Sequence, residues 1–100
     1  MKYDDSKPMF DCIPPNAELE VAKQLTLGAK EYGRDNWYNV QPFHERYLDA
    51  TLRHINAYRR GETFAKDHGT HHLAGAIASL LFILEYDLIT PFIPDTTLEQ

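Results

Sequence analysis

Residues 49–72 form a glycine-punctuated junction between two helical patterns, and this junction constrains the fold more than any other feature. Gly61 ends the first pattern, as glycine commonly does at a helix C-terminus, and Gly69 precedes the start of the second at Thr70. Four of the five histidines and three carboxylates fall in or beside the junction. Acidic, basic and imidazole groups therefore gather where two helices meet, which is where a helical protein would bind a metal and a polyanion.

Proline and glycine divide the rest of the chain in the same way. The patterns predict an all-α fold with three main helices at about residues 16–33, 42–60 and 70–87. Gly33 stops the first helix, Pro42 opens the second, and the prolines after residue 90 forbid further helix. Residues 1–15 and 88–100 are expected to be extended tails. Because no repeat or linker divides the sequence, we expect residues 1–100 to form a single all-α nucleotide-binding domain.

The second helical pattern has a polar face and an apolar face. The polar residues recur at spacings of three and four: Arg46, Asp49, Arg53, Asn56 and Arg60. The apolar residues on the opposite side are expected to face the core: Leu48, Leu52, Ile55 and Tyr58. The third pattern is apolar almost all round, so we expect it to be the central and most buried helix.

Composition limits the possible partners and compartment. The formal charge of −5 argues against binding to a nucleic-acid polymer, which needs a basic surface. Cys12 is the only cysteine, the N-terminus lacks a signal-peptide pattern, and the apolar run at 73–84 is too short for a bilayer. We therefore expect a cytoplasmic protein without a membrane partner. Three helices in 100 residues bury limited surface, so a homo-oligomer, dimer or higher, is expected.

Side-chain chemistry leaves one reaction type open. Asp49, Glu62 and Asp67, with Glu31 or Asp35, would supply hard oxygen ligands for Mg²⁺ or Mn²⁺. The sequence has no His-Glu-x-x-His zinc pattern, no Walker-type glycine loop and no motif around its serines or cysteine. If the protein is an enzyme, metal-assisted attack of water on a phosphate is the remaining reaction type.

Three residues have both a structural and a functional interpretation. Gly28 inside a helix costs about 1 kcal/mol relative to Ala, which indicates close approach of a backbone or a ligand. Trp37 would either stack on a base or cap the core beneath a loop. His54 lies between the polar and apolar faces, so it is either a packed histidine or a ligand-binding one.

Several short motifs together resemble a known family, although each is common alone. They are Asp4-Asp5-Ser6-Lys7-Pro8, Pro14-Pro15, Gly28-Ala29-Lys30-x-Tyr32-Gly33, Asn36-Trp37, Arg53-His54, Gly61-Glu62, Asp67-x-Gly69 and His71-His72-Leu73. The chain resembles the phage-associated dATP/dGTP diphosphohydrolase N-terminal domains, which are linked to the all-α MazG-like NTP pyrophosphohydrolases. The resemblance covers roughly residues 3–88.

The resemblance implies oligomeric helical subunits that use Mg²⁺ or Mn²⁺ to remove pyrophosphate from purine deoxynucleoside triphosphates, in a host cytoplasm if the chain is phage-encoded. It implies metal binding by Asp49, Glu62 and Asp67. It implies phosphate contacts from Lys7, Lys30, Arg34 and Arg53, and base contacts from Asn36 and Trp37. It also implies catalytic roles for Asp49, Glu62, His54 and His72.

The chain departs from the family pattern on its third helix. The family often has a histidine and an asparagine where this sequence has Gly75 and Ser79, and the Glu-x-x-Glu pairs of MazG-like enzymes are missing. These losses keep a second function open, in which the protein sequesters a nucleotide or nucleotide signal without hydrolysing it and counters a host defence. A structural or interaction module with a merely solvated polar face is a third alternative.

Overall fold

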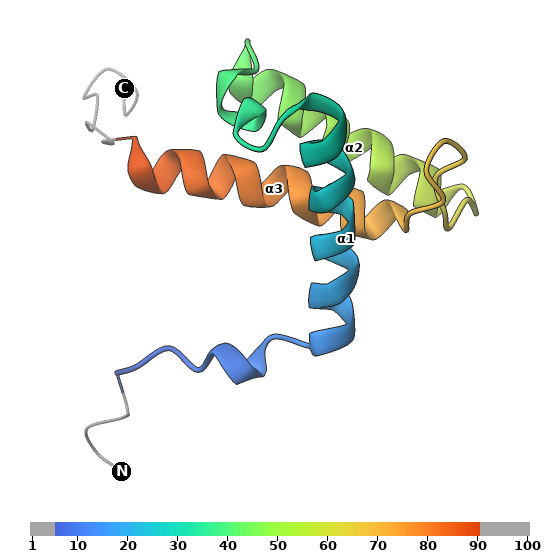
Figure 1. Ribbon diagram of the computed structural model, residues 1–100. Coiled ribbons are helices and arrows are strands. Elements are labelled where there is room, and N and C mark those ends of the chain that lie inside the picture. The colour runs from blue at the N-terminus through green and yellow to red at the C-terminus, as the bar shows by residue number, and fades with distance from the viewer. Residues whose placement is uncertain (1–5, 91–100) are drawn as a thin grey trace, which may run out of the picture.

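The computed structural model describes residues 6–90, and these form an all-α fold (Figure 1). The main helices are α1 (Pro15–Tyr32), α2 (Phe43–Arg59) and α3 (His72–Ile89), and the short 3₁₀ helices are η2 (Phe10–Cys12) and η3 (Asn36–Asn39). Each main helix agrees with the prediction to within two residues at both ends. The N-terminal tail is not wholly extended, since it contains η2. Residues 1–5 and the predicted tail beyond residue 90 lie outside the described residues.

Helix ends follow local chemistry. Pro15 occupies the first turn of α1, where its missing N–H is not needed. Gly33 caps α1 with φ of 99° and donates its N–H to the Ala29 carbonyl, a conformation that residues with a Cβ rarely adopt. At the start of α3 the Nδ1 of His71 accepts the Leu73 N–H at 3.0 Å.

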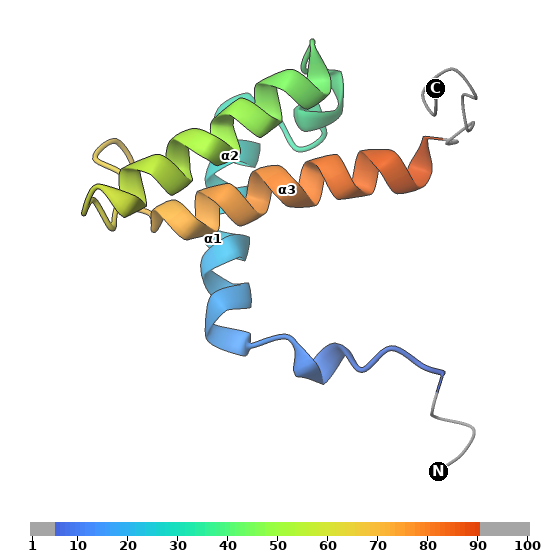
Figure 2. The ribbon, with the colours of Figure 1, turned by 180° about the vertical axis from the view of Figure 1, so that it is seen from behind.

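Helix α3 lies alongside α2, and α1 crosses them so that its first half projects away (Figures 1 and 2). The expectation of a central third helix is confirmed for the first half of α3, which contacts both other helices and contains its buried residues. Its second half continues past α1 and is exposed at Leu81, Leu84 and Leu88. By length and composition α3 could cross a membrane, but a core helix of a soluble protein has the same properties.

Packing between α2 and α3 joins large residues to small ones. Phe43 and Thr51 on α2 are buried, and so are the small residues Gly75 and Ser79 on α3, where Gly75 lies against His54 of α2. The small α3 residues let the two helices approach closely, so the larger α2 side chains fill the space between them.

The prediction for the apolar face of α2 is wrong. Leu48, Leu52, Ile55 and Tyr58 are exposed, with Leu52 at 62%. The physical reason is that α3 packs on another stripe of α2, where Phe43 stacks on Tyr86 and Tyr47 lies against Phe82. Within residues 6–90 no further helix covers the other stripe.

Aromatic rings fix η3 onto α2 and α3. Trp37 stacks on Phe82, with ring centroids 5.0 Å apart and planes 7° apart. Phe43 stacks on Tyr86 at 4.2 Å, and the Tyr47 hydroxyl donates to the Trp37 carbonyl at 3.1 Å. This cluster anchors the segment between α1 and α2, and with it the end of α1.

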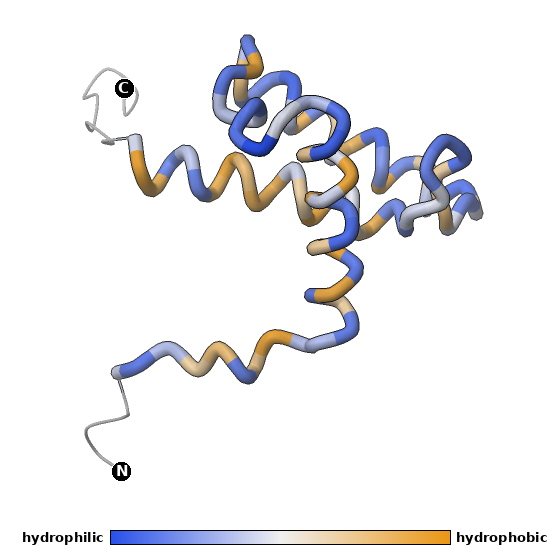
Figure 3. Tube along the Cα trace, in the orientation of Figure 1, coloured by the Kyte–Doolittle hydropathy of each residue, from blue (hydrophilic) through white to orange (hydrophobic). Residues whose placement is uncertain are grey.

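Apolar residues lie along α3 and also on the N-terminal segment, as the hydropathy colouring of the chain shows (Figure 3). Met9, Phe10 and Ile13 are exposed on the N-terminal segment, and Leu84 and Leu88 are exposed on α3. Exposed apolar area of this extent is typical of surfaces that bind another protein. The predicted homo-oligomer therefore stays a prediction that these surfaces favour.

Two substitutions on α3 compare the stability contributed by the aromatic cluster with that contributed by the exposed part of the helix. We expect Phe82→Ala to lower the free energy of unfolding by about 2–3 kcal/mol, because it removes the ring that Trp37 stacks on. Leu84→Ala, two residues further along the same helix and 56% exposed, should cost under about 1 kcal/mol. Urea unfolding at one protein concentration measures both, and equal costs would mean that Leu84 is buried against another molecule.

Candidate functional site

The loop between α2 and α3 is held by backbone hydrogen bonds. The Glu62 N–H donates to the Ala57 carbonyl at 3.0 Å, which closes the end of α2. The His72 N–H donates to the Thr63 carbonyl at 2.9 Å, and the Ala65 N–H donates to the Thr70 carbonyl at 2.7 Å. These bonds bring Glu62 back onto the first turn of α3. The predicted junction is therefore an ordered connection that places a carboxylate against a histidine.

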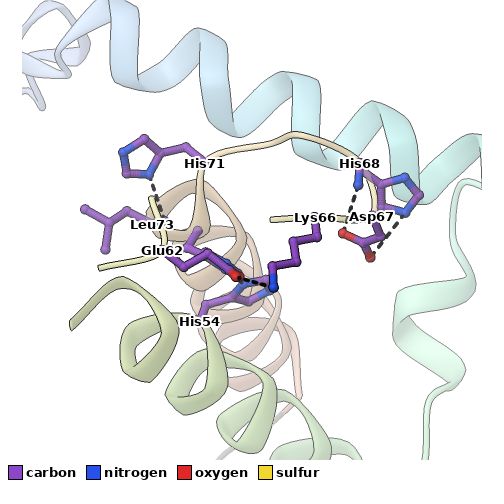
Figure 4. Close-up of polar contacts among 8 residues, drawn as sticks. His54, Glu62, Lys66, Asp67, His68, His71 and Leu73 are labelled. Carbon is purple, nitrogen blue, oxygen red and sulfur yellow. Dashed lines mark hydrogen bonds and ion pairs between the residues drawn. The ribbon is translucent and has the colours of Figure 1, made fainter. Parts of the chain in front are cut away.

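A chain of hydrogen bonds links this carboxylate to α2, and Figure 4 labels the residues at its two ends, Glu62 and His54. The Oε2 of Glu62 lies 2.6 Å from Nε2 of His72, and Nδ1 of His72 lies 2.9 Å from Nδ1 of His54. His72 is buried, with 7% of its surface exposed. Lys66 lies 3.7 Å from the other oxygen of Glu62. Three residues predicted to be catalytic are thus connected in one line.

Gly75 provides the space for His54. A Cβ at position 75 would lie 2.6 Å from both Cε1 and Nε2 of the His54 ring, closer than real Cβ contacts. The imidazole therefore lies against the backbone of α3, where any larger residue would displace it. The glycine that stands at position 75, where the family often has a histidine, therefore makes room for the His54 ring.

Two pKa values in the chain of hydrogen bonds are shifted. Burial, aided by the neighbouring His72 and by the positive charge of Arg53, lowers the pKa of His54 below its ordinary value of 6.5. The hydrogen bond from His72 lowers the pKa of the Glu62 carboxyl below its ordinary 4.5. At neutral pH His54 is therefore neutral and Glu62 is ionised.

A cleft of about 960 Å³ lies between α1, η3 and the α2–α3 pair, and His54 is one of its lining residues. Its volume is within the range of small-molecule sites. The cationic side chains that line it are Arg34, Arg46 and Arg53, and the acidic one is Asp67. Aromatic residues, Tyr32 and Trp37 among them, line it as well. A chain with a net charge of −5 thus has a locally basic cleft.

The cleft continues into a smaller pocket of about 190 Å³. The two share residues from α1 and from the junction: Gln24, Gly28, Tyr32, His54 and Asp67. No atom of the described residues lies within 4 Å of a Cβ built at Gly28, so this glycine opens space in the pocket and admits no second backbone there.

Six of the residues predicted from the sequence meet at this cleft. They are Arg34, Asn36, Trp37, Arg53, His54 and Asp67. The structural interpretation of Trp37 is confirmed, because the ring stacks on Phe82. The residue also lines the cleft, and its stacking on a base stays a prediction.

The other predicted residues lie outside the cleft lining. Lys7 is on the N-terminal segment and Lys30 is in the last turn of α1. Asp49 accepts a 2.9 Å hydrogen bond from Arg53, and both side chains are 69% exposed. Glu62 and His72 contact the cleft only through His54.

The predicted metal ligands do not converge. Asp49 pairs with Arg53, Glu62 pairs with His72, and Asp67 alone of the three lines the cleft. Among residues 6–90 no group of three or more His, Cys, Asp or Glu side chains is placed to hold a metal ion. Metal binding by Asp49, Glu62 and Asp67 together does not fit this arrangement, and it stays a prediction from the sequence.

Sequence reasoning did not assign three residues that the structure places at the site. Arg46 lines the cleft seven positions before Arg53, and the shared helix face was a usable signal for it. Gln24 lies four positions before Gly28 and eight before Tyr32, a spacing that marks the cleft-facing stripe of α1. Its Oε1 is buried without a hydrogen-bond partner among the described residues. The contact between His54 and Gly75 had no signal, because it depends on the register of two helices.

A matched pair of glycine substitutions tests the His54 position. Both Gly28→Ala and Gly75→Ala gain about 1 kcal/mol of helix propensity, but only the Cβ at 75 collides with a ring. We expect Gly75→Ala to be less stable than Gly28→Ala by about 1–3 kcal/mol, the usual cost of overpacking. Chemical denaturation measures the difference, and equal stabilities would show that His54 does not lie against Gly75.

The pH dependence of stability has a definite sign. In the unfolded chain His54 takes up a proton below its ordinary pKa of 6.5. In the folded chain its pKa is lower, so it takes up that proton only at a lower pH. The unfolded state then binds more protons, so the free energy of unfolding falls as the pH drops below this value. Glu62 adds a loss in the same direction at lower pH, since its stabilisation is present above pH 4.5 and is lost as the pH falls through its lowered pKa. We expect Tm to fall as the pH is lowered from about 7.5 to about 5.5, and to fall less in the His54→Asn variant. If Tm depends on pH identically in the two proteins, the pKa of His54 is not lowered.

Comparisons with known proteins agree with the resemblance. The dATP/dGTP diphosphohydrolase, N-terminal, family profile matches residues 1–96. A protein of Salmonella phage PMBT28, named dATP/dGTP diphosphohydrolase, is 36% identical over 83 residues. These residues are 83% of this chain but 28% of that protein, so the chain spans little more than a quarter of its relative. No solved structure matches significantly. The chain therefore belongs to the dATP/dGTP diphosphohydrolase, N-terminal, family.

Proposed function

We propose that this chain binds a purine (deoxy)nucleoside triphosphate in its basic cleft and hydrolyses it to the monophosphate and pyrophosphate. The observation that carries the proposal is the convergence of Arg34, Arg46 and Arg53 with Trp37 and His54 on one cleft. The name of the phage relative supports the substrate class.

The lining of the cleft suits both parts of a nucleotide. Guanidinium groups bind phosphate oxygens through paired N–H donors, and they keep their charge at any physiological pH. Trp37 and Tyr32 offer aromatic faces to a base, and Asn36 offers an amide that can donate to and accept from a purine edge. A triphosphate would bind at the arginines, with its base toward η3.

Hydrolysis needs a group that accepts a proton from water. His54 is the neutral base of the cleft, since its lowered pKa keeps a lone pair available at neutral pH. Arg34 and Arg53 would balance the negative charge that develops on the phosphate as water attacks.

We propose that turnover depends on Mg²⁺ or Mn²⁺. Mg²⁺ is often held by one or two carboxylates together with substrate phosphates, and Asp67 is the carboxylate on the cleft. A bound metal would supply charge neutralisation on the phosphates. We also propose that the protein works as a homo-oligomer in the cytoplasm, that of a host cell if it is phage-encoded.

Product analysis tests the proposal. The purified chain would be mixed with dATP, dGTP and other nucleotides, with Mg²⁺, with Mn²⁺ or with a chelator, and the products separated. Metal-dependent release of monophosphate and pyrophosphate is expected. Intact nucleotide that co-elutes with the protein would overturn hydrolysis and favour the alternative, a protein that sequesters a nucleotide or nucleotide signal. Neither turnover nor retention would exclude both functions for these ligands.

Arginine substitutions test the binding mode. We expect Arg34→Ala and Arg53→Ala each to weaken nucleotide binding about tenfold, since a charge-assisted hydrogen bond contributes about 1.5–3 kcal/mol before solvent screening and tenfold is about 1.4 kcal/mol. Arg59→Ala is the matched control, because Arg59 lies on α2 outside the cleft lining. Titration calorimetry measures the affinities. Equal weakening by all three would mean that only the net charge matters.

A further inference from the structure

Helix α2 has an exposed stripe that repeats at alternating spacings of three and four residues. The stripe, which we call the outer stripe, consists of Glu45, Leu48, Leu52, Ile55 and Arg59. This alternation is the spacing of residues along the seam between two paired helices. All five residues are exposed, with 47% of Leu48 and 62% of Leu52 accessible to solvent. The stripe therefore has the pattern of a helix-pairing surface.

No other described element covers the outer stripe. Helix α2 packs on α3, and α1 passes behind these two helices in the view of Figure 2. Glu45 and Arg59 form no ion pair with the described residues. The helix dipole favours an acid in the first turn and a base in the last, so it accounts for the signs of these two charges. It does not account for the three exposed aliphatic side chains between them.

The outer stripe is complementary to a reversed copy of itself. Leu52 is its middle residue, with Glu45 seven positions before it and Arg59 seven positions after it. When two copies of α2 lie antiparallel with Leu52 facing Leu52, each Glu45 therefore faces the Arg59 of the other copy. Leu48 and Ile55, four positions before and three after the middle, then face each other. A parallel pair would instead place each charge against its like at both ends.

The exposed leucines of α3 lack this property. Helix α3 contains no lysine or arginine, and its two carboxylates, Glu85 and Asp87, both lie near its C-terminal end. Neither orientation of two α3 helices would therefore pair a carboxylate with a lysine or arginine across an interface. Charge complementarity thus selects the outer stripe among the exposed apolar surfaces.

We propose that the outer stripe is the interface of a homodimer, in which α2 packs antiparallel against α2 of a second copy about a two-fold axis at Leu52. A two-fold dimer uses the same patch on both subunits, so that patch has to be self-complementary. The outer stripe meets this condition in its apolar middle and at its charged ends. The inference rests on the proposed function only for the homo-oligomer, to which it gives an interface and an orientation.

The apolar middle and the charged ends contribute differently. Burial of Leu48, Leu52 and Ile55 supplies the affinity. Exposed ion pairs of Glu45 with Arg59 add little energy, but they disfavour the parallel arrangement and so fix the orientation. The 17 residues of α2 make a helix about 25 Å long, so one pair of such helices forms a small interface. We therefore expect a dissociation constant in the micromolar range.

The interface leaves the cleft open. Ala50 lines the cleft and stands two positions before Leu52 on α2. Successive residues of an α-helix are about 100° apart, so these two side chains point to nearly opposite sides. No residue of the outer stripe lines the cleft. The dimer can therefore be disrupted without a change to any cleft residue.

Substitution at the two-fold axis tests the interface. Sedimentation equilibrium of the full chain should show the unmodified protein passing from monomer to dimer as its concentration rises. Leu52→Glu places two carboxylates against each other at the axis, so we expect it to weaken the dimer at least about tenfold. Leu88→Glu is the matched control, because Leu88 is 73% exposed on α3, and it should leave the dimer intact. Circular dichroism shows whether each variant is folded.

Three results would overturn the proposal. The first is an unmodified protein that stays monomeric up to about 1 mM, a concentration at which even weak association is detected. The second is a dimer that a folded Leu52→Glu variant leaves intact. The third is a dimer that Leu88→Glu dissociates and Leu52→Glu does not, which would place the contact on the exposed part of α3.

Exchange of the two charges tests the orientation without any change to the apolar residues. Glu45→Arg alone and Arg59→Glu alone each bring like charges together at both ends of an antiparallel dimer, so each should weaken it about 3- to 10-fold. The variant that carries both substitutions should recover the affinity of the unmodified protein. Arg60→Glu makes the same change in net charge one position off the stripe and should have little effect. In a parallel dimer the single variants would associate as tightly as the unmodified protein, and that result would overturn the antiparallel interface.

The interface and the proposed hydrolysis fail separately. Leu52→Glu should bind nucleotide as the unmodified protein does, because Leu52 lies outside the cleft lining. If the substitutions act on the dimer as expected but no nucleotide is bound or hydrolysed, the proposed function fails and the interface stands. A protein that hydrolyses nucleotide and stays monomeric would overturn the interface alone.

Discussion

The contact between the His54 ring and the backbone at Gly75 is the constraint on which the site depends. It sets how closely α2 and α3 approach, because a Cβ at that position would lie 2.6 Å from the ring. That distance places Nδ1 of His54 within 2.9 Å of His72, whose other nitrogen meets Glu62. Helix packing and the polar chain are thus one arrangement, and neither can shift without the other.

The cleft depends on a different feature, the sparse packing of α1. Val21 is the only buried residue of this helix, and its first half projects away from the α2–α3 pair (Figure 1). The aromatic stack of Trp37 on Phe82 ties η3, the segment that follows α1, to the rest of the fold. The open space between these elements holds three arginines of a chain that is acidic as a whole. Local charge, rather than net charge, therefore decides which ligand can enter.

The three helices could be predicted because their ends are set locally. Gly33 at positive φ and Pro42 at the start of α2 act through their own backbones, so the sequence pattern is sufficient. The buried face of α2 could not be predicted, because the buried residues Phe43 and Thr51 lie on a less apolar stripe than the exposed Leu52. The choice between them is made by the small residues of α3, and it follows from the register between α2 and α3, which no pattern within a single helix sets. The contact of His54 with Gly75 depends on the same register.

The carboxylates show how residues chosen for their chemistry can have different partners from those expected. Asp49, Glu62 and Asp67 share a chemistry that suits a hard cation, and spacing alone gave no reason to separate them. In the folded chain Asp49 hydrogen-bonds to Arg53 and Glu62 to His72. Asp49 is linked to the cleft through Arg53, which lines it. Glu62 is linked to it less directly, through His72 and then His54. A carboxylate that accepts a hydrogen bond can still bind a cation through its remaining lone pairs. It is therefore the separation of the three carboxylates within residues 6–90, and not their hydrogen bonds, that argues against one shared metal site.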